Sequence, residues 1–218
     1  AMDNKEVIIR TLDIGGDKAI DYLSIEKEDN PFLGYRAIRY CLGNKELYKT
    51  QLRAILRAAQ FGNIKIMLPL VTTVDEVKQA KALINECCDE LENEGFRYRN
   101  VPVGVMIETP SAALISDLLA KEAEFFSIGT NDLTGYTMAV DRGNANVSYL
   151  YDVFQPAVLR AIEMTIKNAK AAGIQVGMCG EAAADERLIP KLIDWGLDEF
   201  SVTPSSILQT RKSICLND

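Results

Sequence analysis

The sequence predicts an α/β protein built around a parallel sheet. The chain has 218 residues, of which 48% are hydrophobic and 25% charged, so it is long enough to bury a substantial core as one domain. Short apolar runs of strand length recur along it, and stretches with helical spacing separate them. Because strands and helices alternate, we expect parallel strands joined by helical crossovers.

The expected strands are short runs of apolar, β-branched or aromatic residues. They cover residues 7–9, 64–70, 103–107, 125–128, 174–178 and 200–202. Such near-continuous apolar runs indicate strands buried on both faces, as in a closed barrel or a doubly wound sheet. Periodicity alone does not choose between these two folds.

Apolar residues at three- and four-residue spacing predict the helices between the strands. The clearest stretches contain Leu47, Leu52, Ile55, Leu56 and Ala59, then Val74, Val77, Ala80, Leu83 and Ile84, then Leu114, Ile115, Leu118 and Leu119. The third stretch begins near Pro110, a residue that favours the first helical position.

Functional residue types follow nearly every predicted strand, and this favours the barrel. They include Arg10 and Asp13, Glu108 and Thr109, Asn131 and Asp132, and Cys179 and Glu181. A doubly wound sheet needs such strand ends only at its switch point, whereas a (β/α)8 TIM barrel collects them all round its carboxyl face. Eight strands close that barrel, so we expect a fragment that lacks about the first two βα units.

Two carboxylates are candidate metal ligands. Glu108 follows the third predicted strand and Asp132 follows the fourth, so neighbouring parallel strands would hold them a few ångströms apart. Magnesium takes one or two protein carboxylates and completes its shell with other oxygens, and the absence of histidine disfavours zinc or iron. The alternative is that both acids only cap helices.

Cationic and amide side chains near the same strand ends are candidate anion ligands. Arg10 is followed by two glycines and Lys18; glycines let backbone approach an anion, although such a turn often only reverses the chain. Arg36 lies near a helix amino end, where an anion would offset its charge. Arg142 offers a planar fork to phosphate or carboxylate, beside the amide of Asn131.

Cys179 lies at a strand end between two glycines, where its thiol could donate a proton or attack as a nucleophile. Inert packing is the usual role of a buried thiol. The chain has five cysteines, an odd number, and no C-x-x-C pair, so we expect reduced thiols.

The net charge of −7 and the lack of a basic run argue against nucleic acid or an anionic membrane as partner. No apolar stretch approaches the roughly 20 residues that span a bilayer, and the amino terminus lacks the apolar region of a signal peptide. We therefore expect a cytoplasmic protein without membrane insertion.

Six segments, in order, resemble enzyme I of the bacterial sugar phosphotransferase system, the phosphoenolpyruvate:protein phosphotransferase family. They are residues 10–18, 30–39, 104–110, 129–134, 139–144 and 177–181. The sister families, pyruvate phosphate dikinase and phosphoenolpyruvate synthase, are similar at 129–134 and 179–181. Segments 10–18 and 141–144 look more like enzyme I.

The resemblance implies a role for each candidate residue. Glu108 and Asp132 would ligate Mg2+, and Cys179 would protonate the enolate carbon. The residues expected to hold phosphoenolpyruvate are Arg10, Arg36, Asn131 and Arg142, with Lys18 nearby. The pyruvate formed would leave after phosphate transfer.

The resemblance also implies partners. Residues 1–218 would be a partial phosphoenolpyruvate-binding barrel domain, with part of its last βα unit missing too. The family passes phosphate to a histidine on a separate amino-terminal domain, absent here, and then to a phosphocarrier protein. A homodimer is expected, and the fragment alone is not expected to turn over.

Two alternatives stay open. A partial barrel exposes sheet edges and apolar faces, so the chain could be a non-catalytic dimerisation module. An aldolase or lyase acting on a pyruvate enolate would share magnesium and arginine. The joint presence of Glu108, Asp132, Arg142 and Cys179 favours the phosphotransferase.

Overall fold

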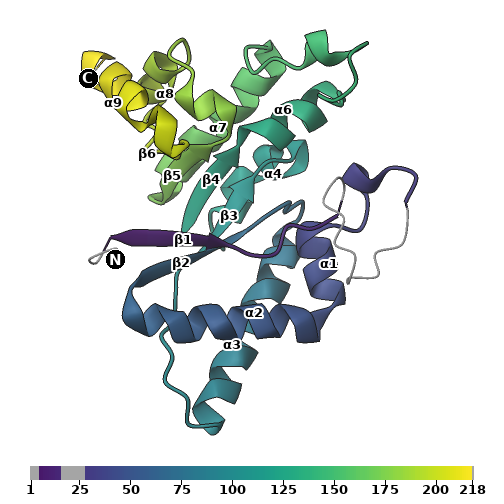
Figure 1. The fold of residues 1–218 in the computed structure, drawn as a ribbon, viewed down its shortest axis with the longest axis vertical. Helices are drawn as coiled ribbons and strands as arrows, with labels where there is room; N and C mark the ends of the chain where they lie inside the picture. Colours follow the sequence, from purple (N-terminus) through teal and green to yellow (C-terminus); the bar gives the residue numbers. More distant parts are fainter. Residues whose placement is uncertain (1–4, 16–27, 218) are drawn as a thin grey trace. The chain divides into compact units, whose positions relative to one another are not determined.

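A computed structural model describes residues 5–15 and 28–217 (Figure 1). The predicted ligand Lys18 lies outside these ranges. The chain forms two compact units, Ala1–Gly104 and Val105–Asp218. Each unit carries parallel strands and helices, so the α/β class is confirmed.

In the first unit, β1 (Glu6–Arg10) pairs in parallel with β2 (Asn63–Leu68), with Ile9 opposite Ile66. The described helices of this unit are α1 (Ala37–Gly43), α2 (Lys45–Ala58) and α3 (Val74–Asn93), with 3-10 turns η1 (Pro31–Leu33) and η2 (Ala59–Phe61). Helices α2 and α3 lie side by side (Figure 1). Their buried apolar residues form the core of this unit.

Helix α3 begins with a capping box. The Glu76 N–H donates to Thr73 Oγ1 over 3.3 Å, and the Thr73 N–H donates to Glu76 Oε2 over 2.8 Å. These bonds satisfy backbone donors that the first turn leaves open. Glu90 of α3 pairs with Lys49 and with Arg53 of α2. In the part of the chain that the structure describes, no helix combines the length and apolar character needed to cross a membrane.

Four further parallel strands follow in chain order, and all but the first two residues of β3 belong to the second unit: β3 (Val103–Ile107), β4 (Phe125–Gly129), β5 (Gln175–Cys179) and β6 (Glu199–Phe200). The described helices are α4 (Pro110–Leu114), α5 (Ser116–Leu119), α6 (Thr130–Met138), α7 (Pro156–Ala172), α8 (Ile189–Trp195) and α9 (Ile207–Asn217). Three 3-10 turns, η3 (Ser148–Leu150), η4 (Glu181–Ala184) and η5 (Pro204–Ser206), connect them (Figure 1). Every residue of β3 and β4 is buried, as predicted for strands covered on both faces, whereas β1 and β6 contain no fully buried residue.

The two largest differences from the predicted strands lie at the ends of β2 and β6. Strand β2 ends at Leu68 because Pro69 has no N–H to continue the ladder and Leu70 takes a left-handed φ of +54°. Strand β6 is only two residues long and begins at Glu199. The strand predicted at residues 200–202 therefore extends two residues beyond the end of β6.

The helix predicted through 114–119 was wrong as a single element. It divides at Ile115, whose φ of −108° and ψ of 21° leave the helical region. The buried Ser116 hydroxyl donates to the Ala113 carbonyl over 2.8 Å. A side-chain bond of this kind competes with the regular helical ladder, and apolar spacing cannot reveal it.

Candidate functional site

The predicted metal ligands lie at the carboxyl ends of two adjacent strands. Glu108 directly follows β3 and is 5% exposed, and Asp132 lies in the first turn of α6, which starts immediately after β4. Since Ile107 lies opposite Ile128, Glu108 reaches the level of Gly129. A Cβ at Gly129 would lie 2.8 Å from both Cβ and Oε2 of Glu108. The glycine therefore makes room for the Glu108 carboxylate.

The donor set at these strand ends suits magnesium. Across residues 5–15 and 28–217, no group of three or more His, Cys, Asp or Glu side chains is arranged to hold a metal. Mg2+ takes only one or two protein carboxylates and draws its other oxygens from water and an anionic ligand. Glu108 and Asp132 together fit that requirement.

Cys179 is held beside the start of α6 by a chain of hydrogen bonds. The Thr130 hydroxyl donates to the Cys179 carbonyl over 3.0 Å, and the Glu181 N–H donates to Asn131 Oδ1 over 3.3 Å. Gly180 lies between them with a φ of +91°, and any Cβ there would collide with Thr130 Oγ1. Only glycine suits this turn, which leaves the Cys179 side chain half-buried at the end of β5.

Arg142 lies in the exposed loop after α6 and is tied back to that helix through Tyr151. The Tyr151 hydroxyl donates to the Asn131 carbonyl over 2.9 Å and interacts electrostatically with the Arg142 side chain. Burial raises the pKa of Tyr151, and the positive charge of Arg142 opposes that shift. The phenol therefore stays protonated and can donate at neutral pH.

One unit thus brings together the larger part of the predicted site. The residues that it gathers at the carboxyl ends of β3, β4 and β5 are Glu108, Asn131, Asp132, Arg142 and Cys179. Their chemistry combines metal ligation, anion binding and an ionisable thiol.

The first unit carries two predicted arginines on one carboxylate. Arg36 donates to Asp13 Oδ1 over 3.1 Å, and Arg10 Nη2 lies 3.4 Å from Asp13 Oδ2. Arg36 and the Asp13 side chain are 3% and 6% exposed. Asp13 thus fixes the position of both guanidinium groups, which are the kind of group that binds phosphate or carboxylate. The anion expected beside Arg36 is thus provided in part by Asp13 itself.

Gly15 allows that pairing. Its φ is +101°, and a Cβ there would lie 2.5 Å from Arg36 Cβ. The next residue of this turn, a second glycine, and Lys18 lie outside the described residues.

Tyr151 was missed by sequence reasoning. It lies 20 residues after Asn131, and neither its spacing nor its neighbours resemble a binding motif. Only the fold brings its hydroxyl to the start of α6. The pairing of Asp13 with both arginines was also missed, although the strand-end position of Asp13 was noted.

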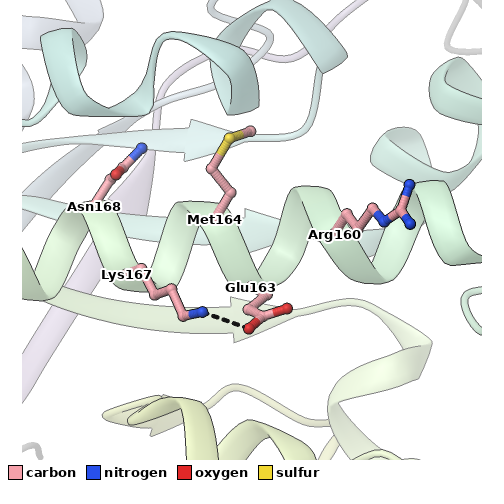
Figure 2. A pocket seen from close by; sticks show the side chains of 5 residues that line it. All are labelled: Arg160, Glu163, Met164, Lys167 and Asn168. Carbon is pink, nitrogen blue, oxygen red and sulfur yellow. Dashed lines mark hydrogen bonds and ion pairs between the residues drawn. The ribbon is translucent and has the colours of Figure 1, made fainter.

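A hollow of about 240 Å³ on α7 is separate from the candidate site residues. Figure 2 shows that its lining residues, Arg160, Glu163, Met164, Lys167 and Asn168, all come from one helix. Glu163 and Lys167 pair with each other over 2.6 Å. None of the candidate site residues lines this hollow.

Solved structures with low sequence identity share the fold. A citrate lyase from Burkholderia xenovorans superposes with a TM-score of 0.58 at 21% identity, covering 77% of this chain and 53% of that one. A pyruvate kinase from Cryptosporidium parvum gives 0.55 at 12% identity, covering 76% and 34%. These similarities support the barrel-type arrangement of parallel strands and helices predicted from the sequence.

Curated relatives are far more similar in sequence. The chain is 55% identical over 214 residues to the phosphoenolpyruvate-protein phosphotransferases of Priestia megaterium and Bacillus subtilis. The matches cover 98% of this chain but only 37% and 38% of those proteins. The family described as PEP-utilising enzyme, PEP-binding domain matches residues 1–217. The chain therefore belongs to the PEP-binding domain family of PEP-utilising enzymes.

Proposed function

We propose that residues 1–218 form the phosphoenolpyruvate-binding barrel domain of a phosphoenolpyruvate-protein phosphotransferase. The observation that carries this proposal is the gathering of two carboxylates, an amide, an arginine and a thiol at adjacent strand ends of one unit. Relatives with 55% identity bear that name, which favours it over a dikinase, a lyase or a non-catalytic dimerisation module. From the family resemblance we extend the proposal to a role in sugar uptake, in the cytoplasm, as a homodimer.

Each side chain then has a defined task. Mg2+ held by Glu108 and Asp132 would supply positive charge to the phosphate and enolate oxygens of the substrate. Asn131 and Arg142 bind and orient the anionic groups of phosphoenolpyruvate from the second unit. The arginines that share Asp13 in the first unit, with Lys18, are assigned to the same ligand by the family resemblance.

The transfer step needs an acceptor outside this chain, which contains no histidine. A histidine nitrogen on a separate domain attacks phosphorus, the bond from phosphorus to the enol oxygen breaks, and its electron pair leaves on the enolate. The enolate carbon then takes the proton of the Cys179 thiol, and this yields pyruvate. Solvent returns a proton to the thiolate. A phosphocarrier protein subsequently receives the phosphoryl group from that histidine.

The thiol step can be tested without the acceptor. In D2O with Mg2+ and inorganic phosphate, the chain should exchange the methyl protons of pyruvate for deuterium, as followed by proton NMR. We expect Cys179→Ser to slow exchange by about a hundredfold or more, since a positioned acid–base group contributes that much. The matched control, Cys215→Ser, changes an exposed thiol and should exchange at the wild-type rate. Exchange by Cys179→Ser at the wild-type rate would remove Cys179 from the mechanism.

A further inference from the structure

Tyr151 joins two parts of the candidate site that are distant in sequence. Its hydroxyl donates to the carbonyl of Asn131, at the start of α6, over 2.9 Å. The same hydroxyl interacts electrostatically with the side chain of Arg142, which lies beyond the end of α6. One phenol oxygen thus links the amino end of the helix, where Asn131 and Asp132 lie, to the arginine of the following loop.

The loop that carries Arg142 has little packing of its own. All residues from 141 to 146 are exposed, and the residue that caps α6 at its carboxyl end, Ala139, has a left-handed φ of +53°. Long arginine side chains lose considerable conformational entropy when they are fixed, so an exposed guanidinium needs a partner to keep one position. The aromatic ring of Tyr151 is half-buried and attached to η3, which makes it a firmer support than the loop.

The charges around the hydroxyl are those of a ligand site. Glu181 and Asp132 are close enough to raise the pKa of Tyr151, while Arg142 lowers it and burial raises it most strongly. Arg142, the predicted anion ligand, and Asp132, the predicted metal ligand, therefore both influence the pKa of the Tyr151 hydroxyl. This differs from an ordinary surface tyrosine such as Tyr149, which is 76% exposed.

We propose that Tyr151 is a positioning residue that holds Arg142 in place relative to the start of α6 for the anionic group of the substrate. The inference rests on the proposed function and extends it to a residue that does not itself touch the reacting atoms. Without the hydroxyl, Arg142 would sample several positions and bind the anion less well.

Limited trypsin digestion tests the position of Arg142 without any ligand. Cleavage after Arg142 depends on opening of this loop, so Tyr151→Phe should accelerate it by about tenfold, the effect of losing one polar interaction with a charged group. Cleavage at other basic residues should keep its rate. Tyr149→Phe is the matched control, because it removes a hydroxyl from the same turn, and it should digest like the wild type.

Calorimetric titration with phosphoenolpyruvate and MgCl2 gives the second readout. We expect Tyr151→Phe to raise Kd by about tenfold. In an Arg142→Gln background, Tyr151→Phe should have no further effect, because the coupled partner is already absent. This double-mutant comparison separates positioning from general loss of stability, which would add to the effect of Arg142→Gln.

The outcomes are distinct. The role of Tyr151 would be overturned if Tyr151→Phe had the same cleavage rate and affinity as Tyr149→Phe. It would also be overturned if the effects of Tyr151→Phe and Arg142→Gln on affinity were additive. If the wild type binds no phosphoenolpyruvate, the proposed function fails, and selective cleavage after Arg142 still decides whether Tyr151 fixes the loop. Uniform acceleration at every tryptic site would mean that Tyr151 is only a structural residue.

Discussion

Gly129→Ala should disturb the carboxylate of Glu108. The added methyl group would lie 2.8 Å from Cβ and Oε2 of Glu108 and 3.1 Å from Cγ of Met106, whereas ordinary contacts begin at 3.4 Å. The carboxylate can rotate away, but Cβ of Glu108 is fixed by the backbone that follows β3. Gly129 has a φ of −88°, which alanine can adopt, so the cost comes from contact and not from backbone strain. Overpacking of this kind costs about 1–3 kcal/mol.

Urea unfolding measures that cost, with Gly62→Ala as the matched control. A Cβ at Gly62 would have no neighbour within 4 Å, and the backbone there is extended with φ of −174°. We expect the free energy of unfolding to fall by about 1–3 kcal/mol for Gly129→Ala and to change little for Gly62→Ala.

A second readout connects the same change to function. Mg2+ and phosphoenolpyruvate added together should raise the Tm of the wild type, because they bind the folded state. In Gly129→Ala the displaced Glu108 carboxylate should reduce that rise, while Gly62→Ala should keep it. If Gly129→Ala had the stability of the wild type and the same rise in Tm, the account in which Glu108 lies beside Gly129 and acts as a metal ligand would be refuted.

Three further predictions concern the first unit. Asp13→Asn should weaken phosphoenolpyruvate binding by about tenfold in calorimetry, because Arg36 loses the charged partner 3.1 Å away; unchanged affinity would contradict the shared-carboxylate account. Burial, followed by the negative charge of Asp13, raises the pKa of Cys41 from 9.0 to about 12, so its contribution to stability is complete below pH 9 and is lost as pH rises toward 12. The unfolding free energy should therefore fall there by up to about 1.4 kcal/mol per pH unit, and a Cys41→Ala variant with the same slope would disprove the assignment. Thr73→Ala removes the acceptor for the Glu76 N–H and should cost about 1 kcal/mol in urea unfolding; no loss would show that the cap is dispensable.

The strands were predictable because each is an apolar run bounded by residues that stop it. All six were confirmed, with β3 at its predicted bounds and the others shifted at their ends. The division of the helix at Ile115 could not be predicted, since it depends on a buried hydroxyl bond of Ser116 within an unbroken apolar pattern. The predicted strand ran past the true end of β2 for two reasons. Pro69, which has no N–H for the ladder, was visible in the sequence but was included in the apolar run, and the left-handed backbone of Leu70 cannot be inferred from hydropathy.

The site was predictable where function coincides with strand ends. Glu108 and Cys179 lie at the ends of β3 and β5, as chain direction indicated. Tyr151 escaped because its role depends on a loop folding back over 20 residues. The pairing of Asp13 with Arg36 escaped for the same reason, since 23 residues separate them. The direction of the strands predicts which residues lie at the carboxyl edge of the sheet. Contacts that a loop makes with a distant part of the chain can be seen only in the folded structure.

Magnesium-dependent binding of phosphoenolpyruvate tests the central claim most directly. We would titrate the chain with phosphoenolpyruvate by calorimetry, with and without Mg2+, and compare it with Asp132→Ala. The account predicts binding that requires Mg2+ and disappears in the variant, because Asp132 is one of two carboxylates at the proposed metal site. Equal binding by Asp132→Ala, or no binding by the wild type with Mg2+ present, would contradict it.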